Sequence, residues 1–452
     1  MLIRFVTSNF LSFDSEVEFN MIAGSLKTHK HHVYNLGKLD ILKGSALYGA
    51  NGAGKSNLIR AIDLFQDLVM SGIVPKNIED KKFKLENENN DKPIFFEIEF
   101  QAKKKIFSYG ININNNLVTE EYLYESGINK EDKLIFERTL SRSKKPTIKM
   151  APKYLKTQKA KLLIELLEDN LLKNNELLLS KHDSLKIKDI TDAINWIKDK
   201  LLVIYPHSKF TGLVQMLSTS NRFKGFANDL LETFDTGISE LSTEDTDIDK
   251  YFGEDDEKLK KEIISDLDED SHIVLPSDSG AVIVTKEDEK YLVKKVISYH
   301  KNSFGENVKF DLEEESDGTQ RLLDFIPAFD LILKNKVTVL IDEIDHSLHP
   351  ALLKTLIQKI MVDERMIGQI IFTTHESNLL DFKIFRQDEI WFVEKDKQSG
   401  SSSLYSLSDF KPRYDLDIRK GYLKGRFGAI PFLANLIELN WNDDYDEKEE
   451  RI

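Results

Sequence analysis

The sequence contains no cysteine among its 452 residues. Disulfide bonds, zinc–thiolate sites and cysteine nucleophiles are therefore excluded. It also lacks any apolar run close to the roughly 18–20 residues that a membrane-spanning helix needs. Its first residues have neither the cationic start nor the long apolar stretch of a secretory signal. These absences favour a cytoplasmic protein that makes no membrane contact.

An excess of positive charge is also missing, because 63 lysines and arginines stand against 77 aspartates and glutamates, for a net charge of −14. A general attraction of the whole surface to nucleic acid is therefore disfavoured. One segment differs, since residues 142–161 carry only basic charges: Arg142, Lys144, Lys145, Lys149, Lys153, Lys156, Lys159 and Lys161. It is either a solvated face or loop, or a local contact for nucleic acid.

The most informative feature that is present is a glycine-rich run that fits the pattern G-x-x-x-x-G-K-[ST]. Its predicted phosphate-binding residues are Gly49, Asn51, Gly52, Ala53, Gly54, Lys55, Ser56 and Asn57. Residues 45–48 are predicted to form a buried strand before it, and residues 56–65 a helix after it. Backbone N–H groups of such a loop cradle phosphate oxygens, and the helix dipole favours the same anion. We expect Lys55 to reach the β- and γ-phosphates.

A second motif lies far downstream, where the apolar strand predicted for residues 337–341 ends in Asp342 and Glu343. Asp342 is placed to hold Mg²⁺ together with the Ser56 hydroxyl, and Glu343 to orient or deprotonate the attacking water. Alone, this motif could be an ordinary acidic turn. Together with the glycine-rich run it predicts that the chain binds a nucleoside triphosphate with magnesium and hydrolyses it.

Three further pieces follow the order of a known motif set. Ser316 and Gly318 precede a helix predicted for residues 322–333, Asp345 follows the paired carboxylates, and His375 follows a buried strand predicted for residues 369–372. A serine and a glycine at a helix start can bind an anion or simply cap the helix. A histidine at the carboxyl end of such a strand lies where open α/β sheets bind ligands, although a lone histidine is more often structural.

The pattern along the chain predicts four regions. Residues 1–125 form a first lobe with the phosphate-binding loop, in which residues 94–100 and 107–113 pair as a hairpin. Residues 126–300 are expected to be a mainly helical insertion that contains leucine-rich helices, an acidic stretch over residues 240–270 and a terminal strand pair. Residues 301–435 form a second α/β lobe, and residues 436–452 a charged tail.

This ordered set resembles the ABC-type ATPases of the SMC/RecF/OLD group. The segments at 9–13, 341–350 and 421–431 are similar to the ATPases of bacterial abortive-infection and anti-phage systems, such as the PARIS defence ATPase and the ATPase half of OLD nucleases. The resemblance implies an α/β P-loop ABC-type ATPase head with two lobes. It implies ATP and Mg²⁺ as ligands, and Lys55, Glu343 and His375 as catalytic residues, with Asp345 in the D-loop. It also implies that Ser316 and Gly318 contact ATP held by another subunit.

Two departures from that pattern shape the functional expectation. The Q-loop glutamine is not assigned, because Gln101 fits a solvent-facing turn residue better than a Q-loop residue. Neither long coiled-coil arms nor a toprim nuclease domain is visible. We therefore expect a homodimer or higher oligomer that controls a separate effector, such as a nuclease or toxin, in anti-phage defence. The alternatives are a DNA-repair ATPase that acts directly on DNA, and an ATP-bound scaffold with negligible turnover.

Overall fold

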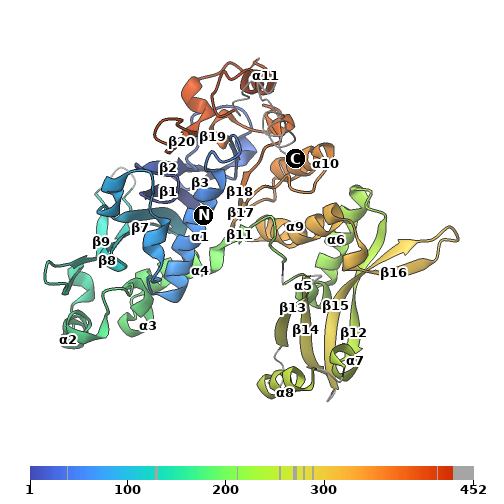
Figure 1. The fold of residues 1–452 in the computed structure, drawn as a ribbon, viewed down its shortest axis with the longest axis horizontal. Coiled ribbons are helices and arrows are strands. Elements are labelled where there is room, and N and C mark those ends of the chain that lie inside the picture. Colours follow the sequence, from blue (N-terminus) through green and yellow to red (C-terminus); the bar gives the residue numbers. More distant parts are fainter. Residues whose placement is uncertain are drawn as a thin grey trace, which may run out of the picture.

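The computed structural model describes residues 1–37, 39–127, 131–210, 212–253, 256–267, 272–277, 280–287, 290–414 and 416–430. The predicted tail at 436–452 and the end of the second lobe, 431–435, lie outside these residues. Three large sheets organise the described chain, with a seven-stranded sheet on the left of Figure 1, a six-stranded sheet in the middle and a five-stranded sheet on the right.

The central sheet is parallel except at one edge, where β20 runs antiparallel to β19. In spatial order its strands are β11 (Leu201–Ile204), β17 (Thr338–Ile341), β18 (Gln369–Thr373), β5 (Gly44–Tyr48), β19 (Ile390–Lys395) and β20 (Ser402–Ser406). Side chains alternate between two hydrophobic clusters, with Leu340 and Ile371 in one, and Val339 and Ile370 in the other. Both faces are therefore covered, which explains the continuous apolar runs of the sequence.

One face of the central sheet is covered by α1 (Lys55–Ser71) and α4 (Lys188–Lys200), which share a hydrophobic cluster with the seven-stranded sheet. The other face packs against α9 (Asp317–Lys334) and α10 (Pro350–Val362). Helix α1 begins directly after the left-handed Gly54 and ends at the left-handed Gly72. Its amino terminus therefore starts at the carboxyl end of β5, where the phosphate-binding loop was predicted.

The seven-stranded sheet is antiparallel throughout. Its order is β10 (Pro146–Met150), β9 (Lys133–Leu140), β8 (Leu117–Glu125), β7 (Lys105–Asn114), β6 (Ile94–Ala102), β1 (Leu2–Ser8) and β2 (Val17–Asn20). The buried Gln369 side chain joins it to the central sheet, because its amide accepts from the Leu2 N–H at 2.7 Å and donates to the Leu2 carbonyl at 2.9 Å.

Smaller elements complete this head. They are the strand pair β3 (Val33–Asn35) and β4 (Asp40–Leu42), and the helices α2 (Gln158–Leu166), α3 (His182–Leu185) and α11 (Ile418–Leu423). No helix in the part of the chain that the structure describes has both the length and the apolar composition needed to cross a membrane.

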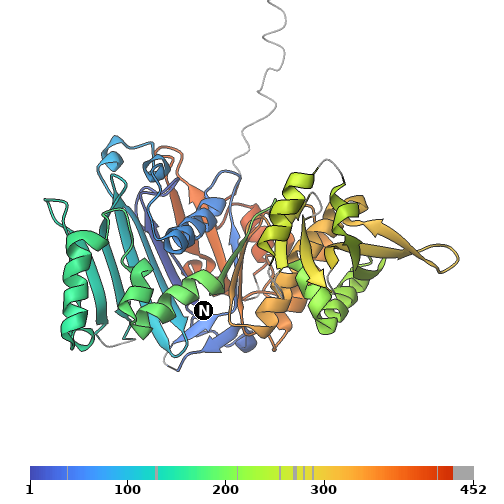
Figure 2. The same ribbon diagram turned by 90° about the horizontal axis from the view of Figure 1, so that it is seen from below.

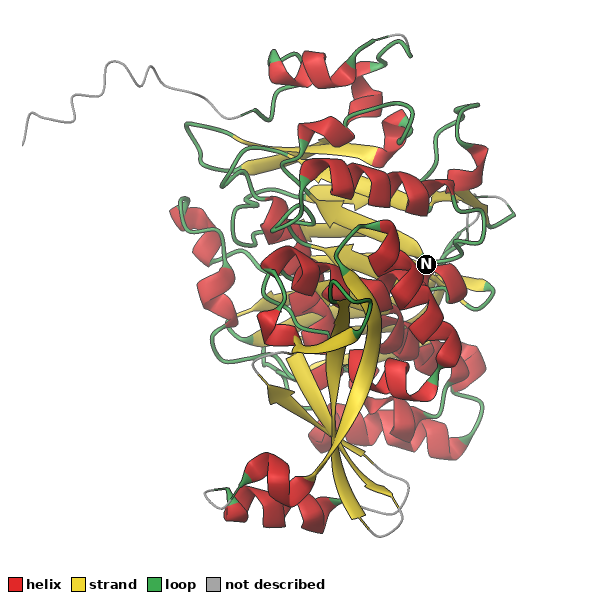
Figure 3. Ribbon diagram, turned by 90° about the vertical axis from the view of Figure 1, so that its right-hand side faces the viewer, coloured by secondary structure: helices red, strands yellow, loops and turns green. Residues whose placement is uncertain are grey.

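A separate β-rich unit is inserted between β11 and α9. It contains α5 (Leu213–Thr219), α6 (Asn221–Thr233), β12 (Ile238–Asp247), α7 (Ile248–Phe252), α8 (Glu257–Asp266), β13 (His272–Ser277), β14 (Gly280–Glu287), β15 (Lys290–Lys301) and β16 (Asn307–Asp311). Figure 2 shows it beside the head, and Figure 3 shows its long strands extending away to the two short helices at the far end.

The α/β fold class is confirmed, but residues 126–300 differ from the mainly helical insertion that the sequence predicts. Strands β9 and β10 continue the seven-stranded sheet, β11 belongs to the central sheet, and β12 to β15 form a sheet of their own. The acidic stretch begins within the ten-residue strand β12, whose acids face lysines of β15, as in the ion pairs Glu244–Lys295 and Asp245–Lys294. Among the expected leucine-rich helices, α2 ends at Leu166 and is followed by a π-helical turn at Leu167–Leu171.

Candidate nucleotide-binding site

The predicted phosphate-binding loop forms a tight turn between β5 and α1. Gly52 and Gly54 have φ values of 74° and 113°, in the left-handed region that favours glycine. Close neighbours also require the absence of side chains, since a Cβ on Gly54 would lie 2.6 Å from the Ser402 hydroxyl, and one on Gly49 would lie 2.4 Å from the Val393 carbonyl oxygen. The Ser402 hydroxyl donates to the Ala53 carbonyl at 2.6 Å. The loop is therefore held in place by β19 and β20.

Lys55 is buried at the first position of α1, with 5% of its surface exposed. Its ammonium donates to the carbonyl oxygens of Gly49 at 2.9 Å and Ala50 at 3.2 Å, and to Nε2 of His375 at 3.0 Å. Burial lowers the pKa of Lys55 to about 8, and the negative charges of Asp342 and two neighbouring acids limit the decrease. An anion that entered the loop would replace these contacts and favour the charged amine.

The two motifs that are 286 residues apart in sequence meet at one pair of side chains. The Ser56 hydroxyl donates to Oδ1 of Asp342 at 3.0 Å, and the Thr373 hydroxyl donates to the same oxygen at 2.6 Å. Thr373 also accepts from the Glu343 N–H at 2.7 Å, which links β18 to the paired carboxylates. A hydroxyl beside a carboxylate is the oxygen set that Mg²⁺ prefers, so these residues fit the metal that the motif implies.

Glu343 and His375 face the same space from neighbouring strands. Glu343 adopts a left-handed φ of 49°, which is unfavourable for a residue other than glycine. Backbone strain of this kind is common at functional sites. The backbone N–H of His375 donates to the carboxylate of Asp345, at 3.2 and 3.3 Å. Burial and then the Lys55 ammonium lower the pKa of His375. Because a lysine can only donate, Nε2 of His375 accepts and the ring proton lies on Nδ1.

These side chains surround an open cavity of about 430 Å³. It is lined by Asn51, Gly52, Gly54, Lys55, Ser56, Asn57, Arg60, Glu343 and His375. The structure therefore brings the predicted loop, with Lys55, together with Glu343 and His375, which follow β17 and β18. Asp342 and Asp345 do not line the cavity, but they form hydrogen bonds with the lining residues Ser56 and His375. The cavity is polar and carries a cation and hydroxyl groups at its base, as a phosphate site requires.

The predicted signature residues lie outside this cavity. Ser316 caps α9, because its hydroxyl accepts from the Thr319 N–H at 3.2 Å. A Cβ on Gly318 would lie 2.8 Å from the Ser347 carbonyl oxygen, so the signature packs beside the segment that follows Asp345. The structure thus places Ser316 and Gly318 on the same chain's surface near the D-loop, and not on the phosphate-binding loop of that chain.

The sequence analysis missed Arg321, one turn into α9. Its side chain is buried, with 3% of its surface exposed, and none of its guanidinium nitrogens has a hydrogen-bond partner. It contacts the Phe325 ring, 4.3 Å from the centroid. Burial lowers its pKa, whereas the charges of Asp324, Asp342 and Glu343 raise it. The helix that carries the signature therefore also places a positive charge behind the paired carboxylates.

The tentative Q-loop residue Gln101 does not belong to this site. Its backbone N–H donates to the Met1 carbonyl at 2.8 Å, at the end of β6 where β1 begins. The neighbouring Leu2 contacts Gln369 at the amino end of β18, whereas the cavity lies at the carboxyl ends of the parallel strands. Within the site, the Asn57 amide donates to the hydroxyl of Ser12, in the loop after β1, at 2.8 Å.

The basic segment 142–161 begins before the edge strand β10 and runs into α2, which lies at the lower left of Figure 1. It contributes no residue to the lining of the cavity. Three of its cations form ion pairs: Lys145 with Asp169, Lys149 with Glu137 and Lys153 with Asp189. The other five, which are Arg142, Lys144, Lys156, Lys159 and Lys161, are exposed.

Comparison with known proteins identifies a family. A family model described as "AAA domain, putative AbiEii toxin, Type IV TA system" matches residues 45–381. The match spans the loop, the paired carboxylates and His375, and so contains every part of the cavity. No curated protein matches the sequence.

Solved structures of SMC head domains also align with the chain. A SmcHead bound to the C-winged helix domain of ScpA is 13% identical, with 91% of this chain and 99% of that chain covered and a TM-score of 0.44. The SMC head domain from Thermotoga maritima is 11% identical, with 90% and 98% covered and a TM-score of 0.38. A Smc head domain with an extended coiled coil, bound to the C-terminal domain of ScpA derived from Pyrococcus furiosus, is 16% identical, with 94% and 99% covered and a TM-score of 0.43.

Proposed function

Since the chain belongs to the AbiEii-type family of AAA domains and is a P-loop ATPase, we propose that it binds ATP with Mg²⁺ between two copies of itself and uses hydrolysis to control a separate effector. The observation that carries this proposal is the convergence of Lys55, Ser56, Asp342, Glu343 and His375 on one cavity.

Each residue has a role that follows from its position. The loop N–H groups and Lys55 would hold the phosphates, with Lys55 exchanging its contacts to loop carbonyls and His375 for phosphate oxygens. Ser56 and Asp342 would hold Mg²⁺, which neutralises phosphate charge when it is bound. Glu343 would accept a proton from the attacking water, and His375 would donate a hydrogen bond toward the γ-phosphate. Thr373 would hold the Asp342 carboxylate and the Glu343 backbone in position through its two hydrogen bonds.

The proposed pairing of two chains rests on the position of the signature. Ser316 and the amino end of α9 are anion-binding groups that lie outside the cavity of their own chain. A second copy could present them to the open side of the cavity, so that ATP contacts both chains. ATP would then bind the paired state more tightly than the separated state and shift the equilibrium toward pairing.

The effector part of the proposal rests on the family. The family description names a toxin of a toxin–antitoxin system. We therefore propose that ATP-dependent pairing holds or releases a nuclease or toxin in bacterial anti-phage defence.

The test uses Glu343→Gln purified from cells that carry the native locus, with native mass spectrometry in ATP and Mg²⁺. A defined additional protein that is lost in Lys55→Ala would support effector control. A pair of chains with nucleotide alone would count against an effector, and unaltered hydrolysis by Glu343→Gln would show that the assigned base is wrong. Negligible turnover by the natural chain would favour an ATP-bound scaffold.

Direct action on DNA is a second candidate, because five exposed cations lie in the turn before β10 and from residue 156 into α2. It predicts DNA-stimulated hydrolysis and an affinity for DNA that falls steeply with salt. The variant Lys144→Glu, Lys156→Glu, Lys159→Glu should then lose DNA binding. The matched control is Lys258→Glu, Lys261→Glu on α8. Equal DNA binding by both variants would remove this candidate site.

A further inference from the structure

Three histidines gather in the turn that leads into β3, on the surface where the head's first residues meet its last strands. His29, His31 and His32 each offer a ring nitrogen, and these nitrogens all lie within 4.8 Å of one another. The rings of His29 and His32 are stacked with centroids 4.7 Å apart, and His31 stands edge-on to His32 at 4.4 Å. His29 reaches this position with a left-handed φ of 46°.

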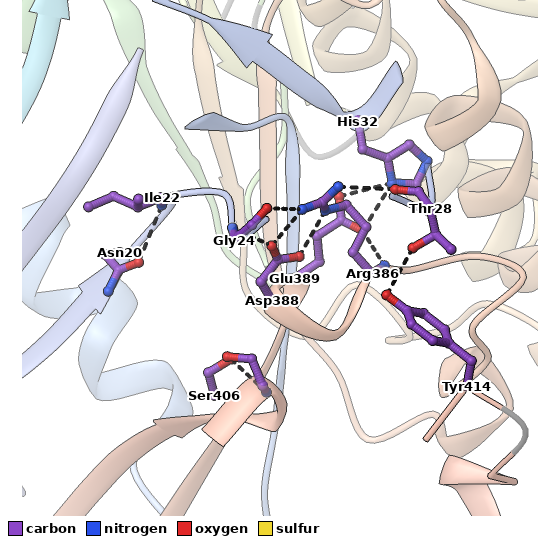
Figure 4. A network of polar contacts seen from close by, with 11 residues as sticks. Asn20, Ile22, Gly24, Thr28, His32, Arg386, Asp388, Glu389, Ser406 and Tyr414 are labelled. Carbon is purple, nitrogen blue, oxygen red and sulfur yellow. Dashed lines mark hydrogen bonds and ion pairs between the residues drawn. The ribbon is translucent and has the colours of Figure 1, made fainter. Parts of the chain in front are cut away.

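A buried carboxylate orients the innermost histidine. His32 is 1% exposed, and its Nδ1 lies 2.9 and 3.0 Å from the two oxygens of Glu389, which is itself fully buried. Figure 4 shows His32 and Glu389 together with Arg386, which donates to Asp388. A carboxylate on one ring nitrogen is the arrangement that prepares the other nitrogen of a histidine for a metal ion.

Two ring nitrogens of the cluster lack partners, whereas Nε2 of His29 lies 2.7 Å from the Phe382 carbonyl oxygen, so that Nδ1 of His29 is left to bind an ion. Nε2 of His31 and Nε2 of His32 are both buried and neither has a hydrogen-bond partner. Buried polar atoms normally have a partner, and leaving one without a partner costs about 1–3 kcal/mol. A neutral imidazole nitrogen is also the form that binds metal.

We propose that His29, His31 and His32 bind a divalent transition metal ion of the zinc class, with Glu389 as the residue that orients His32. Imidazole nitrogen is a preferred ligand of such ions. Zinc–nitrogen distances of about 2.0–2.1 Å would place two ligand atoms about 3.3 Å apart. Ion binding would require the half-buried His29 and His31 rings to rotate toward that spacing, and for His29 this rotation competes with the contact of its Nε2 with the Phe382 carbonyl oxygen. No cysteine is needed for this ligand set.

The ion would stabilise the turn before β3, which contacts Glu389, the residue before β19. Around the cluster, Arg386 donates to the carbonyl oxygens of Gly24 and Thr28, both at 3.0 Å. The Lys43 N–H donates to the His32 carbonyl at 2.8 Å, directly before β5. The proposed site therefore joins the segment before β3 to the amino ends of β5 and β19, at the opposite end of the central sheet from the phosphate-binding loop.

The test measures zinc binding to the full chain, after treatment with a chelator and without nucleotide, in competition with a chromophoric zinc indicator. We expect one tightly bound Zn²⁺ per chain. His31→Gln removes a half-buried ligand with little risk to folding and should weaken binding at least tenfold. His182→Gln, which changes a histidine outside the cluster, should bind as the natural chain does. Zn²⁺ should raise the melting temperature of the natural chain and of His182→Gln, but not that of His31→Gln.

Four results would overturn the proposal. The first is a natural chain without tight zinc binding, and the second is equal binding by His31→Gln. The third is a tight ion that is lost in Asp342→Asn and kept in His31→Gln, because that ion would lie in the nucleotide site. Loss of binding in His182→Gln would likewise place the tight site elsewhere.

Discussion

Replacement of Arg321 by methionine should make the protein more stable and less active. The guanidinium is buried, is 3% exposed and has no hydrogen-bond partner, so folding removes its hydration without replacing it. Such a charge costs several kcal/mol. The contact with Phe325 returns about 1–2 kcal/mol, and the nearby carboxylates return more. We therefore expect a net gain of about 1 kcal/mol on replacement by methionine, which has a similar shape.

The loss of activity has a separate cause. The charges of Asp342 and Glu343 act on Arg321, so the guanidinium in turn acts on the carboxylates that hold the metal and the attacking water. Removal of a preorganised charge near reacting groups commonly lowers turnover by about 10²-fold or more. Because Arg321 lies behind the carboxylates and outside the cavity lining, we expect kcat to fall at least tenfold while KM changes little.

The assay combines thermal unfolding with steady-state ATP hydrolysis for Arg321→Met and Arg321→Lys. A gain of about 1 kcal/mol should raise the melting temperature by about 2 °C. Arg365→Met serves as the control, because Arg365 is exposed and pairs only locally with Asp363. A methionine variant with a lower melting temperature and normal kcat would refute the reasoning, since it would show that the guanidinium supports the fold and not the reaction.

Three other predictions concern the cavity. Because the pKa of Lys55 is about 8 and phosphate favours the ammonium form, nucleotide binding above pH 8 takes up a proton. Above that pH, the affinity for a non-hydrolysable ATP analogue should fall by up to about tenfold per pH unit. An affinity that stays constant from about pH 7 to about pH 9.5, measured by calorimetry, would contradict this. Thr373→Val removes the 2.6 Å hydrogen bond to Asp342 and should lower kcat at least tenfold with nucleotide binding retained, as measured by hydrolysis and calorimetry. Gly54→Ala should abolish nucleotide binding, because its Cβ would lie 2.6 and 2.7 Å from two serine hydroxyls at a φ of 113°, whereas Gly225→Ala in open space should bind normally.

The sequence predicts those parts of the site that depend on local pattern. The loop at 49–56 requires glycines because of its own backbone conformation, which is a local property. The paired carboxylates follow an apolar strand that must be buried. Their meeting at the Ser56–Asp342 contact follows from the motif pair alone. The hairpin at 94–113 could equally be predicted, because apolar and polar residues alternate along both strands.

The sequence pattern does not predict the strands of the β-rich unit in the same way. Strand β12 buries only Ile238 and Leu241, and its other positions are serines, threonines and acids, of which Glu244 and Asp245 pair with lysines of β15. An acidic, polar run of this kind resembles a flexible segment until its partner strand is known. The strand β11 follows α4 without a break, and four apolar residues cannot be assigned to a sheet by periodicity.

Two functional features needed the structure for a different reason. Arg321 lies among apolar helix positions, and composition rules place a charged residue of this kind at the surface. The three histidines at 29–32 are close in the sequence, but the buried Glu389 that contacts His32 lies 357 residues later. The burial of Arg321 and the contact between His32 and Glu389 have no local signal, since both arise from tertiary contacts.

The most direct test of the central claim is the mass of purified Glu343→Gln in solution, measured with and without ATP and Mg²⁺ by analytical ultracentrifugation. The account predicts a monomer without nucleotide and a pair of chains with ATP. Ser316→Arg should abolish that pairing, because the signature would then block the shared site. A chain that binds ATP and stays monomeric, or a pair that forms equally well without ATP, would contradict the account.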